Sequence, residues 1–315
     1  MADLDLVRRT FELFRTDVEA PPPLTLRGGC AVDSYDRPAP FDPALDAPND
    51  AYLEAFAYWG LIYLDARSWR HYLPRLIDYA LRRSDDPAMV TEALVRSLRP
   101  PDRYPPRLST LTADQEAVIR SFLEQAAFSS SLAHVEADAQ QALEEWWLPN
   151  PRSRPTVEDI AALRSAPVIH RPVIGDVYGL SVPDTFTGSG ARDIPEESRR
   201  VQTWGGLLCG DAQTVIAVNV TPLNVRSLED SVRTRATFFR DAPSVRSIGV
   251  PGSVHATRLD GMIDGQSPAE PQTFVMILAA AGNELVTLSI RSWPRADLDR
   301  EVDRIAQSLE ITSKR

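Results

Sequence analysis

The sequence predicts an α+β protein in two parts: an all-α N-terminal half, then a half in which a mostly antiparallel sheet packs against helices. Three observations lead to this fold class. Apolar residues recur at helical spacing up to about residue 148. From residue 173 onwards they alternate with a period of two, as in strands. The chain has 315 residues, a length typical of about two domains.

The first helices are expected from their apolar stripes. One helix begins near Asp3 and carries Leu4, Val7, Phe11 and Phe14 on a single stripe. Residues 20–48, which are rich in Pro, Gly and Asp, are expected to be mostly irregular. Asn49 then caps an amphipathic helix. Its apolar face, the face that a globular helix turns towards the core, holds Tyr52, Ala55, Phe56, Trp59, Ile62 and Tyr63.

Pro74 is expected to interrupt the next helical segment, because proline lacks the N–H group that a helix interior needs. We therefore predict a break near Tyr72 and a new helix over about 73–83. Further helices are expected over about 88–98, after the capping box Thr112-Ala-Asp-Gln115, and from about 131 to 148, where the last helix ends in Trp146 and Trp147.

Composition sets the expected domain boundaries. Residues 1–148 form the helical domain, and the segment 149–165 joins a linker, PNPRSRP, to one short helix. Residues 166–315 form the second domain, in which strand-like runs are separated by Gly, Pro, Asn and Asp. Two helices belong to this domain. Ser227 caps the first, and the second carries Leu298, Val302, Ile305 and Leu309 on one face.

Short motifs in the second half are similar to those of one known fold. Tyr178-Gly-Leu-Ser-Val-Pro183 looks like an opening strand that ends in a proline turn, here Pro183-Asp-Thr-Phe186. Val250-Pro-Gly-Ser253 looks like the turn into a central hairpin. Val286-Thr-Leu-Ser-Ile290 and the helix that runs to Gln307-Ser-Leu-Glu-Ile311 look like a closing strand and helix. With these motifs, residues 166–315 resemble the PsbP-like α/β/α sandwich, a fold that includes the PsbP family and DcrB-type and LpqN-type bacterial proteins.

This resemblance implies a binding or scaffolding module, because members of the fold share no catalytic residues. The best understood bacterial relatives include chaperones for secreted effectors. Many bacterial members are exported lipoproteins, whereas the N-terminus here lacks a secretory signal pattern, so the expected location is cytoplasmic. The helical half looks like an uncharacterised bacterial helical family with a Y-L-P-x-x-[LI] segment, here Tyr72-Leu-Pro-Arg-Leu-Ile77.

Charge and hydropathy narrow the expected partners. No run of about 18 apolar residues occurs, so no membrane span is expected. The formal net charge is −10, and residues 1–165, with 26 acidic residues and 18 Arg, carry −8 of it. An acidic chain is repelled by nucleic acid, so we expect no nucleic-acid partner. A protein partner is expected instead, offering a basic or an apolar segment.

Few motifs carry chemistry. Cys30 and Cys209 are too few for a disulfide framework or a thiolate zinc site. No G-x-S-x-G, Walker A or G-x-G-x-x-G pattern occurs. His134 and Asp138, one helical turn apart, are typical of a solvated helix face. We therefore expect no catalytic residue, no metal and no cofactor.

Two sets of residues are candidate binding sites. The densest basic cluster could hold an anion, or could be an outer helix face paired with acids; it consists of Arg67, Arg70, His71 and Arg75. Trp146 and Trp147 point about 100° apart on a helix, so one is expected in the core and the other against the second domain or a partner. Trp204 is either an interface anchor on an exposed sheet face or a core residue.

The sequence leaves three functions open. The first, which we favour, is a non-enzymatic adaptor or chaperone that binds a protein partner, such as a secreted effector. The second is an immunity-type inhibitor of a basic toxin, which the acidic helical half suggests. The third is an enzyme with a site assembled from distant residues, and the Arg67–Arg75 cluster would be the place to look for it.

Overall fold

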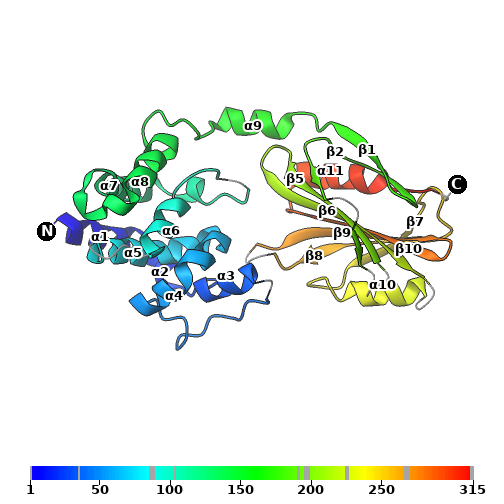
Figure 1. Ribbon diagram of the computed structural model, residues 1–315, viewed down its shortest axis with the longest axis horizontal. Coiled ribbons are helices and arrows are strands. Elements are labelled where there is room, and N and C mark those ends of the chain that lie inside the picture. Colours follow the sequence, from blue (N-terminus) through cyan, green and yellow to red (C-terminus); the bar gives the residue numbers. More distant parts are fainter. Residues whose placement is uncertain are drawn as a thin grey trace. The chain divides into compact units, whose positions relative to one another are not determined.

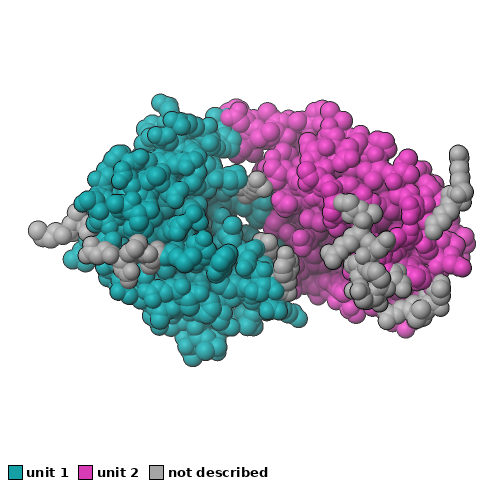
Figure 2. All heavy atoms as spheres, viewed as in Figure 1, with its two compact units in different colours: residues 1–156, 266–270 teal, residues 157–265, 271–315 magenta. Residues whose placement is uncertain are grey.

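The computed structural model describes residues 2–34, 36–84, 89–102, 104–189, 192–194, 199–223, 227–265 and 270–312. The chain divides into two compact units: residues 1–156 with 266–270, and residues 157–265 with 271–315 (Figure 2). The described part of the first unit is built from helices, and the second contains the sheets (Figure 1). The α+β class predicted from the sequence is confirmed.

Two helices of the first unit begin at the caps that the sequence predicts. The Asn49 side chain accepts a hydrogen bond from the Tyr52 N–H group, and Thr112 and Gln115 form the predicted capping box. The helices are α1 (Ala2–Leu13), α2 (Arg15–Glu19), α3 (Leu26–Asp33), α4 (Asp50–Gly60), η1 (Leu61–Tyr63), α5 (Ala66–Arg82), α6 (Met89–Ser97), η2 (Leu108–Thr110), α7 (Ala113–Phe128), η3 (Ser130–Val135), α8 (Glu136–Ala142) and the π-helical turn η4 (Leu143–Trp147).

Helix α3 lies in the region expected to be mostly irregular. Thr25 caps it by accepting a hydrogen bond from the Gly28 N–H group. Its two glycines disfavour a helix by propensity but allow a close approach to the end of α4. A Cβ atom on Gly29 would lie 2.3 Å from the Gly60 carbonyl oxygen, and one on Gly60 would lie 2.1 Å from the Leu26 carbonyl oxygen. Tertiary packing therefore favours this helix where local composition does not.

Helix α5 runs through Pro74 without a break, so the predicted interruption near Tyr72 is wrong. The proline removes one hydrogen bond and costs about 3 kcal/mol in a helix interior. Both turns that flank it are deeply buried, with Trp69, Tyr72, Leu73, Leu76 and Ile77 all at 0% exposure. Burial of side chains of this size stabilises the fold by about 1.5–3 kcal/mol each, which outweighs the loss.

An ion pair holds the irregular segment before α4 in place. Asp46 is fully buried and accepts hydrogen bonds from Arg27 Nε at 3.0 Å and Arg27 Nη2 at 2.9 Å. It also accepts a bond from the Tyr52 hydroxyl at 3.2 Å and one from the Asp42 N–H group. Burial acts to raise the pKa of Asp46, but these donors outweigh it, and the pKa is lowered.

The second unit contains the strands β1 (His170–Ile174), β2 (Tyr178–Pro183), β3 (Thr187–Gly188), β4 (Arg192–Ile194), β5 (Arg199–Leu208), β6 (Ala212–Pro222), β7 (Ser244–Ile248), β8 (Ala256–Ile263), β9 (Gln272–Ala281), β10 (Glu284–Ser292) and β11 (Glu310–Ile311). Its helices are α9 (Val157–Ser165), α10 (Leu228–Ala236) and α11 (Ala296–Gln307). Ser227 caps α10 as predicted. A turn follows Ile174, so the strand-like pattern that begins at residue 173 is divided between β1 and β2.

Two antiparallel sheets form this unit. The larger has the order β3-β5-β6-β10-β9-β8-β7, with β4 also paired to β5, and the smaller has the order β1-β2-β11. Helix α10 packs on one face of the large sheet, over Met276, Leu278 and Leu285. Helix α11 and the small sheet lie on the other face (Figure 1). This layering is the predicted α/β/α sandwich with an antiparallel sheet.

Replacing Gly29 by alanine is expected to destabilise the first unit by about 1–3 kcal/mol, because the new methyl group would collide with backbone atoms of Gly60. Urea unfolding followed by far-UV circular dichroism measures the change. Gly249→Ala is the matched control, since a Cβ atom there meets nothing within 4 Å. Equal stability of the two variants would contradict the close contact.

Replacing Asp46 by asparagine is expected to cost about 1–3 kcal/mol near neutral pH, because Arg27 loses its charged partner. The lowered pKa of the Asp46 carboxyl means that its contribution is complete above its unfolded pKa of about 3.9 and is lost as the pH falls through the lower folded value. Unfolding free energies of wild type and variant should therefore converge below about pH 4. A gap that stays constant with pH would contradict this role of the ion pair.

Candidate functional site

The predicted basic cluster lies on one side of α5, and two of its members are held by Asp17. Arg70 Nε lies 3.1 Å from Asp17 Oδ1, and His71 Nδ1 lies 2.9 Å from the Asp17 carbonyl oxygen. Burial lowers the pKa of His71. Arg75 extends over the Phe11 ring at 5.8 Å, and Arg67 lies near the helix start. Arg70 is therefore paired with an acid, as expected for an outer helix face. An anion site in this cluster stays a prediction.

Both tryptophans before the linker are buried, so the expectation that one of them faces outwards is wrong. Trp146 is 2% exposed and Trp147 is 1% exposed, and both belong to the core of the first unit. They lie in the π-helical turn η4, and the Arg154 guanidinium lies over the Trp146 ring, 5.3 Å from its centroid, so the segment after the turn covers this ring. The Trp147 indole N–H donates to the Leu98 carbonyl oxygen at 2.8 Å.

Trp204 is also buried, at 2% exposure, so an exposed sheet face is the wrong alternative for it. Its ring lies against Gly188 on the neighbouring strand, where a Cβ atom would come within 2.7 Å of Trp204 Cδ1. Gly188 therefore makes room for the ring, and Trp204 is a core residue.

The cysteines lack the environment of a nucleophile. Burial raises the pKa of Cys209 to about 11, and the Asp297 carboxylate adds to this effect more than Arg295 opposes it. Burial likewise raises the pKa of Cys30. In the part of the chain that the structure describes, no group of three or more His, Cys, Asp and Glu side chains could hold a metal ion.

The most distinctive surface lies on α4 and η1. Four apolar side chains at helical spacing, i, i+4, i+8 and i+11, are exposed there, and we call them the α4 stripe: Ala51, Ala55, Trp59 and Ile62. Trp59 is 58% exposed and Ile62 is 70% exposed. The apolar pattern of the sequence assigned three of these residues to a core-facing side, so the placement of Ala55, Trp59 and Ile62 is a correction.

Helical spacing fixes the angle of a side chain about the helix axis but not what covers it along the axis. Tyr52 and Trp59 point in nearly the same direction, since they are seven residues apart. Tyr52 is covered by the chain that carries Arg27 and Asp46: its hydroxyl donates to Asp46 and accepts from the Arg27 N–H group. Trp59 lies about two helical turns further along, and none of the described residues covers its ring in this way.

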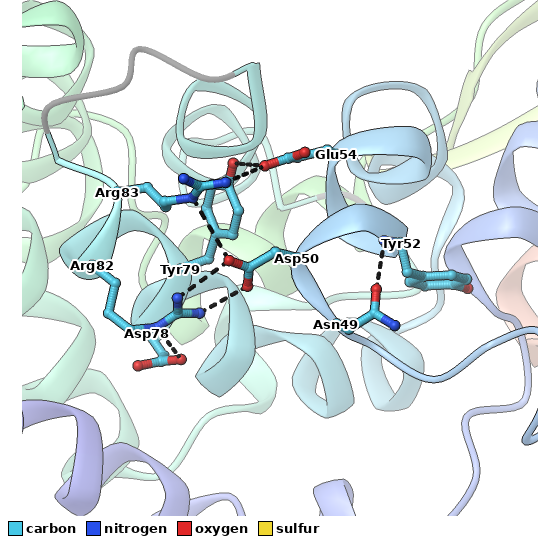
Figure 3. A network of polar contacts seen from close by, with 8 residues as sticks. All are labelled: Asn49, Asp50, Tyr52, Glu54, Asp78, Tyr79, Arg82 and Arg83. Carbon is cyan, nitrogen blue, oxygen red and sulfur yellow. Dashed lines mark hydrogen bonds and ion pairs between the residues drawn. The ribbon is translucent and has the colours of Figure 1, made fainter.

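A polar network, the α4–α5 clamp, holds the side of α4 next to the stripe (Figure 3). Asp50 accepts hydrogen bonds from Arg82 at 2.9 and 3.2 Å and lies 3.6 Å from Arg83 Nε. Glu54 accepts bonds from the Tyr79 hydroxyl at 2.7 Å and from Arg83 at 3.2 Å. The hydrogen bonds from Arg82 lower the pKa of Asp50. These contacts fix α4 against α5 and leave the stripe on the outside.

Local contacts also order the stripe itself. The rings of Tyr58 and Trp59 pack edge to face, with centroids 4.8 Å apart. The Tyr63 hydroxyl donates to Asp33 at 2.7 Å, which ties η1 to α3. Trp59 and Ile62 are therefore presented on a rigid helix, the arrangement in which an exposed aromatic anchor loses little entropy on binding.

Residues 3–151 match the model of a family described as a family of unknown function, DUF6714. No curated protein matches the chain. None of the helices in the described ranges is both long and apolar enough to cross a membrane.

Solved structures similar to this chain cover about half of it. Cyanobacterial PsbP (CyanoP) from Synechocystis has 14% identity and a TM-score of 0.34, over 47% of this chain and 95% of its own. The Ran-binding protein Mog1p from Saccharomyces cerevisiae has 10% identity and a TM-score of 0.30, over 47% and 97%. LpqN from Mycobacterium tuberculosis, involved in cell envelope biogenesis, has 13% identity and a TM-score of 0.25, over 51% and 99%. These likenesses concern the fold alone.

Two tryptophan substitutions in the first unit should separate surface from core. Trp59→Ser is expected to change the unfolding free energy by less than about 0.5 kcal/mol, because the ring is largely exposed. Trp147→Ala is expected to cost about 3–5 kcal/mol, because it removes a buried ring and its hydrogen bond to Leu98. Urea unfolding monitored by circular dichroism tests both. Similar losses in the two variants would mean that Trp59 stabilises the fold rather than a complex.

Proposed function

We propose that the protein is a non-enzymatic cytoplasmic adaptor or chaperone that binds a protein partner through the α4 stripe. The observation that supports this proposal is the exposed pair Trp59 and Ile62 on a helix that is fixed on its other sides. Adjacent exposed apolar residues of this size are typical of interaction sites, and tryptophan is enriched among the residues that dominate binding energy.

The partner segment that fits this surface is the apolar face of an amphipathic helix. Ala51 and Ala55 are small, so a partner backbone can approach them closely, while Trp59 and Ile62 supply the large side chains. Burying a large apolar side chain such as Ile62 contributes about 1.5–3 kcal/mol to binding. Basic residues at the edges of the partner helix would be favoured, because residues 1–165 carry a net charge of −8.

An inhibitor of a basic toxin is the second candidate, and the same acidic balance supports it. The two candidates differ in the physics of the contact. Binding through the α4 stripe should persist in high salt, because apolar burial is not screened. Binding of a folded basic domain by charge should be lost as the salt concentration rises.

A cross-linking experiment tests the adaptor proposal. We expect full-length protein carrying a photo-cross-linking residue at position 55 to capture one specific protein from its native cytosol, in low and in high salt. The double substitution Trp59→Ser and Ile62→Ser should weaken that protein's binding by about 30-fold or more, the effect of losing an interface anchor.

Phe128→Ser is the matched control, because Phe128 is 77% exposed at the end of α7, away from the stripe. It should leave capture unchanged. Equal capture by all three proteins, or no specific capture by any of them, would contradict binding through the α4 stripe. A partner that is released by salt and is insensitive to Trp59 would support the inhibitor instead.

A further inference from the structure

A small pocket opens in the second unit, beside the turn between β1 and β2. Its volume is about 230 Å³. The floor consists of Tyr178, Val218 and Val220, each below 7% exposure, and the rim carries Ile174, which is 80% exposed. A depression with a buried apolar floor and an exposed apolar rim can enclose the stem of one long side chain. It is smaller than the about 300–1,000 Å³ of typical small-molecule sites.

The local sequence builds this pocket. Gly175 forms the turn, and a Cβ atom there would lie 2.3 Å from Tyr178 Cε1, so the tyrosine ring packs directly on the glycine. The Tyr178 hydroxyl donates to Gln202 Oε1 at 2.7 Å, which links the small sheet to β5. Arg200 is the cross-strand neighbour of Val220, so both side chains reach the same face of the large sheet.

Asp176 and Arg200 line the pocket, and a second acid outside the lining, Glu284, also pairs with Arg200. Arg200 donates to Asp176 through one terminal nitrogen and to Glu284 through the other, the second contact being 2.6 Å. Two carboxylates thus share one guanidinium group, and these three side chains together carry a net charge of −1. These two contacts engage both terminal nitrogens of Arg200, whereas the Asp176 side chain is 70% exposed. The pocket therefore offers an accessible carboxylate, whereas its guanidinium group is already paired with two acids, and this favours a cation over an anion.

We propose that this pocket binds the side chain of a basic residue, arginine or lysine, presented by a protein. The aliphatic stem would lie along Ile174, Val218 and Val220, and the cationic end would pair with Asp176. Side chains that combine a long apolar stem with a charged end match a site that combines an apolar floor with an exposed carboxylate. The site belongs to the second unit alone, so this proposal is independent of the α4 stripe.

A titration of the isotope-labelled full-length protein with n-butylguanidinium tests the proposal by NMR. We expect saturable shifts of the backbone amides of Tyr178, Val218 and Val220. n-Butylurea, a neutral analogue of similar shape, should bind at least about tenfold more weakly, since a hydrogen bond to a charged group is lost. Equal binding of the two probes, shifts confined to other residues, or no shifts at all would overturn the proposal.

Substitutions distinguish the role of Asp176 from general charge effects. Asp176→Asn is expected to weaken n-butylguanidinium binding about tenfold. Asp184→Asn, which removes the same charge just after the far end of β2, should leave it unchanged. Val220→Leu, which adds a methylene group at the floor, should reduce binding of both probes while the remaining amide spectrum stays that of the wild type. Unchanged affinity in Asp176→Asn, or an equal loss in Asp184→Asn, would overturn the assignment.

Discussion

The close contact between α3 and α4 is the constraint on which the candidate site depends. Gly29 and Gly60 bring two helix backbones together at a distance that no side chain could share. This contact fixes the angle of α4, the ion pair of Arg27 with the buried Asp46 covers its first turns, and the α4–α5 clamp holds its flank. Only the remaining side, the α4 stripe, stays open. Its exposure is therefore a consequence of three separate restraints on one helix rather than of a loosely packed end.

The second unit obeys a different constraint, the alternation of side chains along its strands. On β5 the residues Arg200, Gln202 and Trp204 share one face of the large sheet. Trp204 is buried beside Gly188, whereas Arg200, four residues earlier, reaches the open end of the layer and pairs with acids. The alternation of side chains along β5 thus places a core residue, Trp204, and a charged residue of the pocket wall, Arg200, on the same face of the sheet. The pocket forms where this end of β5 meets the turn between β1 and β2.

Much of the fold could be predicted from the sequence, because at most elements the local signals, such as helix caps and apolar stripes, agree with the tertiary packing. The caps at Asn49, Thr112 and Ser227 and the apolar stripe of α11 all lie where the pattern places them. The pattern failed where packing overrode local preference, as in the glycine-rich α3 and at Pro74. It also failed for the site. Spacing alone could not separate Tyr52 from Trp59, and Arg200 gave no signal besides its place on an inward-facing strand position.

The two surfaces proposed to bind protein differ in their response to salt, and this difference determines how they could act together. Contact with Trp59 and Ile62 depends on apolar burial, which salt does not screen. Contact with Asp176 depends on charge at a partly exposed group, which salt weakens. A partner that engaged both would lose only part of its affinity as salt rises, because salt does not screen the apolar contact. A partner that engaged only the pocket would be released. The salt dependence of a wild-type complex, compared with that of the Trp59 and Ile62 double variant, therefore tells whether the chain acts through one surface or two.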